Sequence, residues 1–116
     1  MKKSSRKNSL KTIILEGCPW SKALDELLKI KKIKSKIFKV NATTKHKYKT
    51  ALIDTFPQLY FIDNTEHLIG GYSETKRLLD IINEHKENID IIKNKAKEIL
   101  PEFDDKMILK LLILLT

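Results

Sequence analysis

The chain has 116 residues, which fits one small domain with a single hydrophobic core. Hydrophobic residues make up 41% and charged residues 33%, which is too apolar for a disordered chain, and a single cysteine, Cys18, rules out an internal disulfide. The formal net charge of +8 raises the possibility of nucleic-acid binding, but the distribution of the lysines argues against it. Its lysines are mixed with acids, and the densest basic stretch, 29–39, is interleaved with apolar residues, as in a helix end followed by a strand.

Residues 1–10 are basic, and the apolar run that follows them, Ile13 to Leu15, is too short for the core of a signal peptide. We therefore expect a basic tail over residues 1–10 and a protein of the reducing cytoplasm. No membrane span is expected either, because the apolar run within 106–116 is far shorter than the roughly 20 residues that a bilayer requires.

The first predicted elements are a strand, a helix and a second strand. Lys11 to Glu16 is expected to form a short buried strand. Pro19 suits the first position of a helix, where its missing N–H costs nothing, so Cys18 is predicted at the N-cap. The second strand, Lys36 to Val40, is expected to pair in parallel with the first. The helix carries an apolar stripe with Trp20 alongside: Leu24, Leu27, Leu28 and Ile30.

The middle of the chain predicts a helix, a hairpin and another helix. The helix follows the polar turn 41–44, carries Tyr48, Leu52 and Ile53, and ends near Asp54. The third strand begins just after the proline of "FPQLYFID", and a turn at 63–65 joins it to a short fourth strand, 67–69. Two glycines end that strand. Ser73 is then expected to cap a helix with an apolar stripe: Leu78, Leu79, Ile81 and Ile82.

Two further helices are predicted over residues 86–116. The first ends at Pro101, and Asp104 or Asp105 is expected to cap the second. The last helix is expected to pack on the domain, with a partner groove or a membrane surface as alternatives. The stripe of the first helix consists of Ile89, Ile92, Ala96, Ile99 and Leu100.

The position of Cys18 indicates a reactive thiol. At a helix N-cap, a sulfur meets free N–H groups and the positive end of the helix dipole, which favour the thiolate. Cysteines placed in this way have pKa values below the usual value of about 8.5, and the thiolate is the nucleophile. Lys22, in the first turn, is a candidate for further charge stabilisation. The alternative is that Cys18 is a small inert core residue.

Three separated motifs together resemble those of glutaredoxins: Cys18-Pro19-Trp20-Ser21, Thr55-Phe56-Pro57 and Gly70-Gly71-Tyr72-Ser73. The resemblance covers residues 11–85. It implies a thioredoxin-like α/β fold of order βαβαββα, with a small mixed four-stranded sheet and with 86–116 as a helical extension. Ser21 replaces the resolving cysteine of the family, which implies a monothiol mechanism.

The resemblance also implies a glutathione site. The turn at Pro57 would face the thiol through a cis peptide bond, and the backbone of Phe56 would pair with that of glutathione. Read alone, Pro57 is equally a proline at the start of a strand. Gly70 and Gly71 read alone form a simple turn, but they also permit close approach of a ligand. The N–H groups at the following helix start would bind the γ-glutamyl carboxylate. The candidate glutathione-binding residues are Lys22, Phe56, Pro57, Gly71, Tyr72 and Ser73.

The implied function is a glutathione-dependent thiol–disulfide oxidoreductase that removes glutathione from proteins through Cys18. Glutathione is then a co-substrate, glutathionylated proteins are the partners, and the chain is a monomer. Leu15 stands where most of the family has a lysine that helps hold glutathione, and Lys11 or Lys22 are candidates to replace it.

Two other functions remain open. In one, Cys18 and glutathione thiols hold a [2Fe–2S] cluster between two subunits. In the other, the chain is a catalytically inactive interaction module. No other metal site is expected, because the histidines, His46, His67 and His85, lack the spacing of a zinc site.

Overall fold

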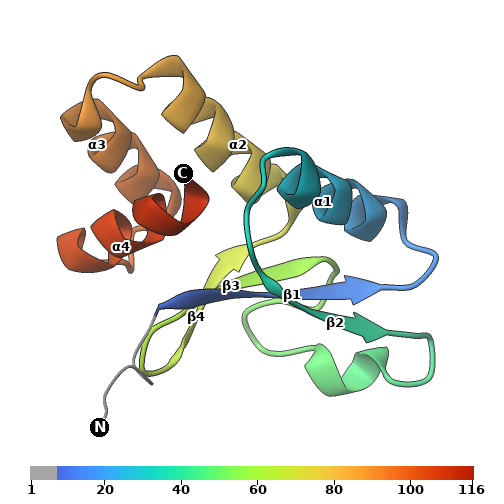
Figure 1. The fold of residues 1–116 in the computed structure, drawn as a ribbon. Helices are drawn as coiled ribbons and strands as arrows, with labels where there is room; N and C mark the ends of the chain where they lie inside the picture. Colours follow the sequence, from blue (N-terminus) through green and yellow to red (C-terminus); the bar gives the residue numbers. More distant parts are fainter. Residues whose placement is uncertain (1–7) are drawn as a thin grey trace, which may run out of the picture.

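A mixed four-stranded β-sheet forms the centre of the protein, as seen in a computed structural model that describes residues 8–116 (Figure 1). The strands lie in the order β2-β1-β3-β4. β1 pairs in parallel with β2 and antiparallel with β3, and β3 pairs antiparallel with β4. The parallel pair and the hairpin confirm the predicted sheet. The bounds of the strands are β1 (Ser9–Leu15), β2 (Lys36–Val40), β3 (Gln58–Ile62) and β4 (Glu66–Gly70).

The first strand begins two residues earlier than the sequence suggested. β1 starts at Ser9, and Leu10 is 1% exposed within the main core. The end of the predicted tail is therefore part of the sheet, because an apolar residue at this position continues the alternation of the strand. Residues 1–7 of that tail lie outside the described part of the chain.

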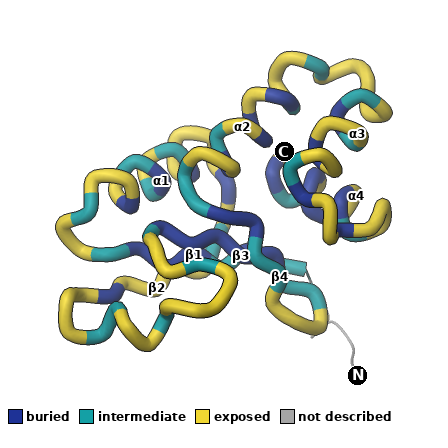
Figure 2. The backbone as a smooth tube through the Cα atoms, turned by 180° about the vertical axis from the view of Figure 1, so that it is seen from behind, coloured by how far each residue is buried: buried dark blue, intermediate teal, exposed yellow. Residues whose placement is uncertain are grey.

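Two helices, α1 (Pro19–Ile30) and α2 (Tyr72–Glu84), lie over one face of the sheet (Figure 1). Leu59 and Phe61 point toward them, whereas Tyr60 belongs to a second cluster on the opposite face. This alternation follows from the period of two residues in a strand. Figure 2 shows that β1 and β3, the two central strands, carry most of the buried residues of the sheet, whereas β2 is largely exposed. One stripe residue departs from the prediction: Ile30, at the end of α1, is exposed.

The prediction of a helix that ends near Asp54 is wrong. Only a 3-10 turn, η2 (Lys45–Tyr48), forms between β2 and β3. The hydroxyl of Thr50 accepts the N–H groups of Leu52 and Ile53, each at 3.1 Å, and the N–H of Thr50 donates to the carbonyl of Ile53 at 2.7 Å. These local bonds take the place of helical ones, and Leu52 is left exposed.

The last two helices, α3 (Ile89–Ile99) and α4 (Asp105–Leu115), pack against α2 and one end of the sheet. Asp104 caps α4, as predicted, by accepting the N–H of Met107 at 2.8 Å. Ile89, which the predicted stripe included, is instead half exposed. No helix in residues 8–116 is both long and apolar enough to cross a membrane. The buried residues of the extension are Ile92, Ala96, Leu100, Phe103, Ile108, Leu111, Leu112 and Leu115, which confirms its packing on the domain.

Candidate active site around Cys18

Cys18 occupies the N-cap of α1, as the sequence predicted, and Pro19 is the first helical residue. The chain reverses direction just before it, because Gly17 adopts a left-handed conformation with φ of 79°. The N–H of Cys18 donates to the carbonyl of Leu15 at 3.1 Å, and its carbonyl accepts the N–H of Lys22 at 3.1 Å. The backbone on both sides of Cys18 is thus fixed, and the thiol is partly exposed just beyond the C-terminal end of β1, a central strand.

The surroundings of Cys18 lower the pKa of its thiol. Burial is the largest single influence and raises the pKa. Hydrogen bonds from the N–H and hydroxyl of Ser21 and from the N–H of Trp20 together outweigh it, because they stabilise the thiolate. Lys22, a candidate for this role in the sequence, is not among the groups that shift the pKa.

Ser21 is buried beneath the thiol, with 1% of its surface exposed. Its Oγ accepts a hydrogen bond of 3.0 Å from the N–H of Leu15, and its hydroxyl hydrogen is left to donate to Cys18. From the sequence, Ser21 is expected only to replace the resolving cysteine of the active-site motif. Its position three residues after an N-cap was the available signal of this contact.

The turn at Pro57 faces Cys18. The Phe56–Pro57 peptide bond is cis, and the Sγ of Cys18 lies 3.8 Å from the carbonyl oxygen of Phe56. Only the protonated thiol can donate to this carbonyl. The fold therefore brings two of the three motifs together at the sulfur.

A buried glutamine that the sequence analysis missed holds this turn in place. The Nε2 of Gln58 donates to the carbonyls of Tyr48 at 2.8 Å and Thr55 at 3.2 Å. Its Oε1 accepts the hydroxyl of Tyr60 at 2.8 Å. Gln58 is fully buried and follows Pro57 directly, so it ties the loop before the proline to the sheet.

The third motif lies against the proline turn. Gly70 has a φ of 139°, and a Cβ there would come within 2.7 Å of Glu74 Oε1. A Cβ on Gly71 would come within 3.2 Å of the carbonyl oxygen of Pro57. Gly71, rather than the predicted Ser73, is the N-cap of α2, and its N–H donates to Glu74 Oε1 at 2.7 Å. Ser73 is an exposed residue of the first helical turn.

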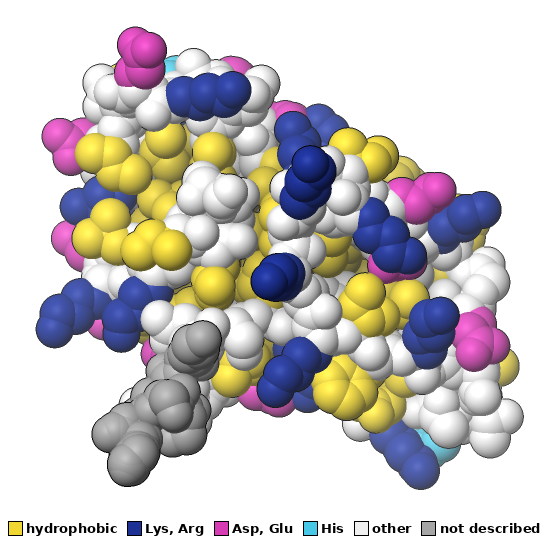
Figure 3. All heavy atoms as spheres, viewed as in Figure 1, with side chains coloured by type: hydrophobic (Ala, Val, Ile, Leu, Met, Phe, Trp, Pro, Cys, Tyr) yellow, Lys and Arg dark blue, Asp and Glu magenta, His cyan; other side chains and the backbone are white. Residues whose placement is uncertain are grey.

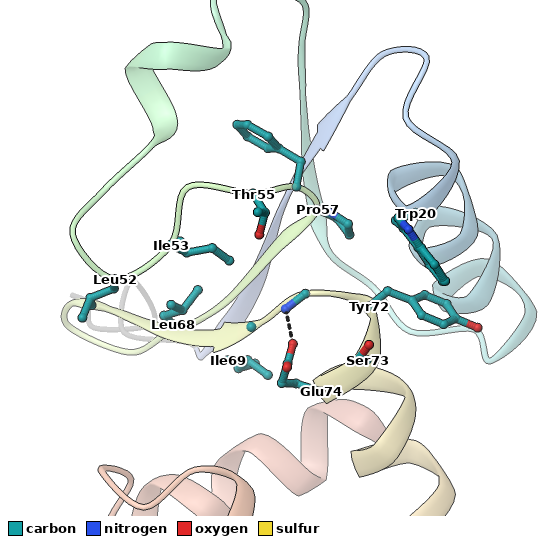
Figure 4. A pocket seen from close by; sticks show the side chains of 13 residues that line it. Trp20, Leu52, Ile53, Thr55, Pro57, Leu68, Ile69, Tyr72, Ser73 and Glu74 are labelled. Atoms are coloured by element: carbon teal, nitrogen blue, oxygen red, sulfur yellow. Dashed lines mark hydrogen bonds between the residues drawn. The ribbon is translucent and has the colours of Figure 1, made fainter.

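These motifs enclose a pocket of about 440 Å³ (Figure 4). The rings of Trp20 and Tyr72 lie side by side at one end, with their centroids 5.5 Å apart, and Trp20 is 61% exposed. Five of the predicted site residues thus share the pocket with Trp20. The lining residues are Trp20, Leu52, Ile53, Thr55, Phe56, Pro57, Leu68, Ile69, Gly70, Gly71, Tyr72, Ser73 and Glu74.

The remaining site residues line a second hollow of about 490 Å³ that includes Cys18. Lys22 belongs to this hollow and not to the pocket of Gly71. Lys11 lies near the start of β1, where its ammonium group binds Glu66 at 2.7 Å. Neither lysine therefore lines the pocket. The site residues in the second hollow are Cys18, Pro19, Ser21 and Lys22.

The histidines take no part in this site. His67 Nε2 lies 2.9 Å from Asp63 Oδ1 and 3.0 Å from Thr65 Oγ1, in the β3–β4 turn. Within residues 8–116, no group of three or more His, Cys, Asp or Glu side chains is arranged to hold a metal ion.

The sheet order, the cis-proline turn and the thiol at the first helix N-terminus define a thioredoxin-like fold. No model of a known protein family matches the chain, and neither does any curated protein sequence. Among solved structures, the chain is similar to glutaredoxin 1 from Francisella tularensis, determined in complex with cacodylate. The TM-score is 0.53 and the identity 21%, and the match covers 66% of this chain and 98% of that chain. The similarity shows the fold, and the rest of this chain lies outside it.

Proposed function

We propose that this protein is a glutathione-dependent thiol–disulfide oxidoreductase that acts by a monothiol mechanism. The observation that carries the proposal is the placement of Cys18. Its thiol has a lowered pKa and lies 3.8 Å from the carbonyl of Phe56, beside a pocket built by the other two motifs. Thiol–disulfide exchange requires an accessible thiolate and a means of aligning the disulfide, and this arrangement supplies both.

In the first step, the thiolate of Cys18 attacks the glutathione sulfur of a protein–glutathione mixed disulfide. A Cys18–glutathione disulfide forms, the original disulfide breaks, and the protein leaves as a thiolate that takes a proton from water. In the second step, the thiolate of another glutathione attacks the sulfur of the bound glutathione. Glutathione disulfide leaves and the Cys18 thiolate is restored. Ser21 and Trp20 donate hydrogen bonds to the Cys18 thiolate and so stabilise it both as the nucleophile of the first step and as the leaving group of the second.

The pocket suits the γ-glutamyl end of glutathione, which carries a carboxylate and an ammonium group on one carbon. The N–H groups of Tyr72 and Ser73 belong to the first turn of α2 and have no partner within the helix, so they attract the carboxylate. The carboxylate of Glu74 lines the same pocket and attracts the ammonium group. The backbone of Phe56 would then align the middle of the peptide beside Cys18.

The cluster-binding alternative has less support. A [2Fe–2S] cluster takes four thiolate ligands, and the chain offers only Cys18. Within residues 8–116, no group of three or more His, Cys, Asp or Glu side chains is arranged around it to complete a ligand set. Three of the four ligands would have to come from a second chain and from glutathione.

The test is the reduction of a glutathionylated peptide by glutathione, followed through the glutathione disulfide formed. We expect turnover by the native protein, none by Cys18→Ser, and a single glutathione adduct on Cys18 by mass when glutathione disulfide is added. Ile113→Ser, at an exposed residue that lines neither hollow, serves as the control and should keep full activity. Absence of both turnover and adduct would overturn the proposal. A coloured dimer on anaerobic purification with glutathione would favour the cluster instead.

A further inference from the structure

A groove far from Cys18 lies where the C-terminal helices meet α1 and α2. It has a volume of about 440 Å³, within the range of small-molecule sites, and such sites commonly lie between packed helices. On the side of the protein shown in Figure 3, hydrophobic side chains gather over α3 and α4. The groove is lined by Lys31, Leu79, Ile82, Asn83, Lys86, Ile89, Ile92, Leu115 and Thr116.

The lining of the groove divides into an apolar floor and a cationic rim. Leu79, Ile92 and Leu115 are buried members of the main core and form the floor. Lys31 and Lys86 are exposed, and neither makes an ion pair within residues 8–116. None of the lining residues is Asp or Glu. The groove therefore offers apolar contact and the ammonium groups of two lysines that form no ion pair within residues 8–116.

We propose that this groove binds a free long-chain carboxylate, a molecule with one anionic group and an unbranched alkyl chain. The alkyl chain lies on the floor of Leu79, Ile92 and Leu115, and the carboxylate lies between the ammonium groups of Lys31 and Lys86. Lysine side chains suit this role because their stems extend along apolar surface while the charge stays at its edge.

Two other occupants fit the groove less well. A second copy of this chain related by twofold symmetry would place the same cationic rim against itself. The N-terminal segment MKKSSRK carries four basic and no acidic residues, so the rim would repel it. An anionic amphiphile satisfies both the floor and the rim.

The groove is independent of the thiol site. Cys18 precedes the first residue of α1 and Lys31 follows its last, and the 12-residue helix between them is about 18 Å long. Binding in the groove therefore requires neither glutathione nor Cys18, and its presence or absence does not bear on the proposed oxidoreductase activity.

The experiment is calorimetric titration of the full chain with dodecanoate, below the concentration at which it forms micelles. We expect one binding event, with affinity falling by about fifteenfold for decanoate, which is shorter by two methylenes at about 0.8 kcal/mol each. 1-Dodecanol, which has the same chain without the charge, should bind at least fivefold more weakly. The Lys31→Gln, Lys86→Gln double variant should lose about fivefold for dodecanoate and nothing for the alcohol.

Two exposed isoleucines provide a matched pair of variants that keep the core intact. Ile89 lines the groove and is 51% exposed, whereas Ile113 is 73% exposed and does not line it. Ile89→Glu should weaken dodecanoate binding at least tenfold, because it places a negative charge at the carboxylate. Ile113→Glu should leave it within twofold. Absence of binding, equal binding of the alcohol, or equal losses in the two variants would overturn the proposal, as would tighter binding of an acidic amphipathic peptide to the same groove.

Discussion

The sulfur of Cys18 lies 3.8 Å from the carbonyl oxygen of Phe56, a residue 38 positions further along the chain. Neither residue reaches the other through local structure. The contact exists because β1 and β3 are neighbours in the sheet, and each is continuous with one of the two motifs. The hydroxyl of Ser21 donates a hydrogen bond to the sulfur, and the amide of Gln58 binds the carbonyl of Thr55 next to Phe56.

Ser21→Ala should raise the pKa of Cys18, because it removes a hydroxyl that donates to the thiolate. The rate of alkylation by iodoacetamide, measured against pH, should shift to higher pH. The buried N–H of Leu15 also loses its acceptor, which should lower the free energy of unfolding by about 1–3 kcal/mol. Lys22→Gln is the control and should leave the alkylation profile in place. The opposite pattern would show that a lysine charge, rather than the hydroxyl, stabilises the thiolate.

Ser21→Cys should form an intramolecular disulfide with Cys18. The two residues are three positions apart at the start of α1 and are therefore neighbours on one face, about one helical turn apart. The Ser21 side chain already donates a hydrogen bond to the sulfur. After oxidation by glutathione disulfide, the variant should lose two hydrogens by mass and carry no glutathione. Monothiol turnover should persist. Two stable glutathione adducts would contradict the geometry.

Gln58→Leu should loosen the turn that faces Cys18. The hydroxyl of Tyr60 and the carbonyls of Tyr48 and Thr55 lose their partner, and each such group left buried costs about 1–3 kcal/mol. Tyr60→Phe leaves only one buried group, the Oε1 of Gln58, without its partner and should be milder, at about 1–3 kcal/mol in total. Urea unfolding measures both. If the turn positions glutathione, Gln58→Leu should also raise KM for a glutathionylated peptide more than Tyr60→Phe does, and equal KM values would contradict that role.

Truncation after Leu100 should abolish cooperative folding. It removes five buried side chains, each of which contributes about 1.5–3 kcal/mol, and their sum is comparable to the whole stability of a small domain. Thermal unfolding followed by circular dichroism is the measurement. An unchanged melting temperature would mean that α4 serves a partner or a membrane surface rather than the core. The removed side chains are Phe103, Ile108, Leu111, Leu112 and Leu115.

Asp63 should contribute stability that is lost in acid. The N–H of Thr65 has the largest influence and lowers the pKa of the Asp63 carboxyl, burial opposes it, and His67 lowers the pKa further. Because the folded pKa is below the ordinary value of 3.8, the stabilisation is present above about pH 3.8 and is lost as the pH falls through the folded value. Asp63→Asn should make the free energy of unfolding, measured with urea, depend less on pH between pH 2 and about pH 4. Asp54→Asn, at an exposed site, is the control and should leave this pH dependence as in the native protein. If Asp63→Asn also left it unchanged, Asp63 would not be the source of the acid-sensitive stability.

The local features of the chain were readable from its sequence. Gly17 and Pro19 around a lone cysteine place Cys18 at an N-cap, because only local backbone rules are involved. Alternating and periodic apolar residues likewise gave the four strands and the helices α1 to α4. The failure was the segment before Pro57, where the hydroxyl of Thr50 competes with helical hydrogen bonds that a pattern of apolar residues cannot weigh.

Tertiary structure alone decided which residues meet. Lys22, a candidate to bind glutathione, lines the hollow of Cys18, whereas Gly71 lines the other pocket, and only the folded chain shows this division. Gln58 looked like one polar residue in an apolar strand, and only the folded chain shows that its amide joins three separate groups. Periodicity specifies the face on which a side chain lies, whereas partners distant in sequence are set by the order of strands and the packing of layers.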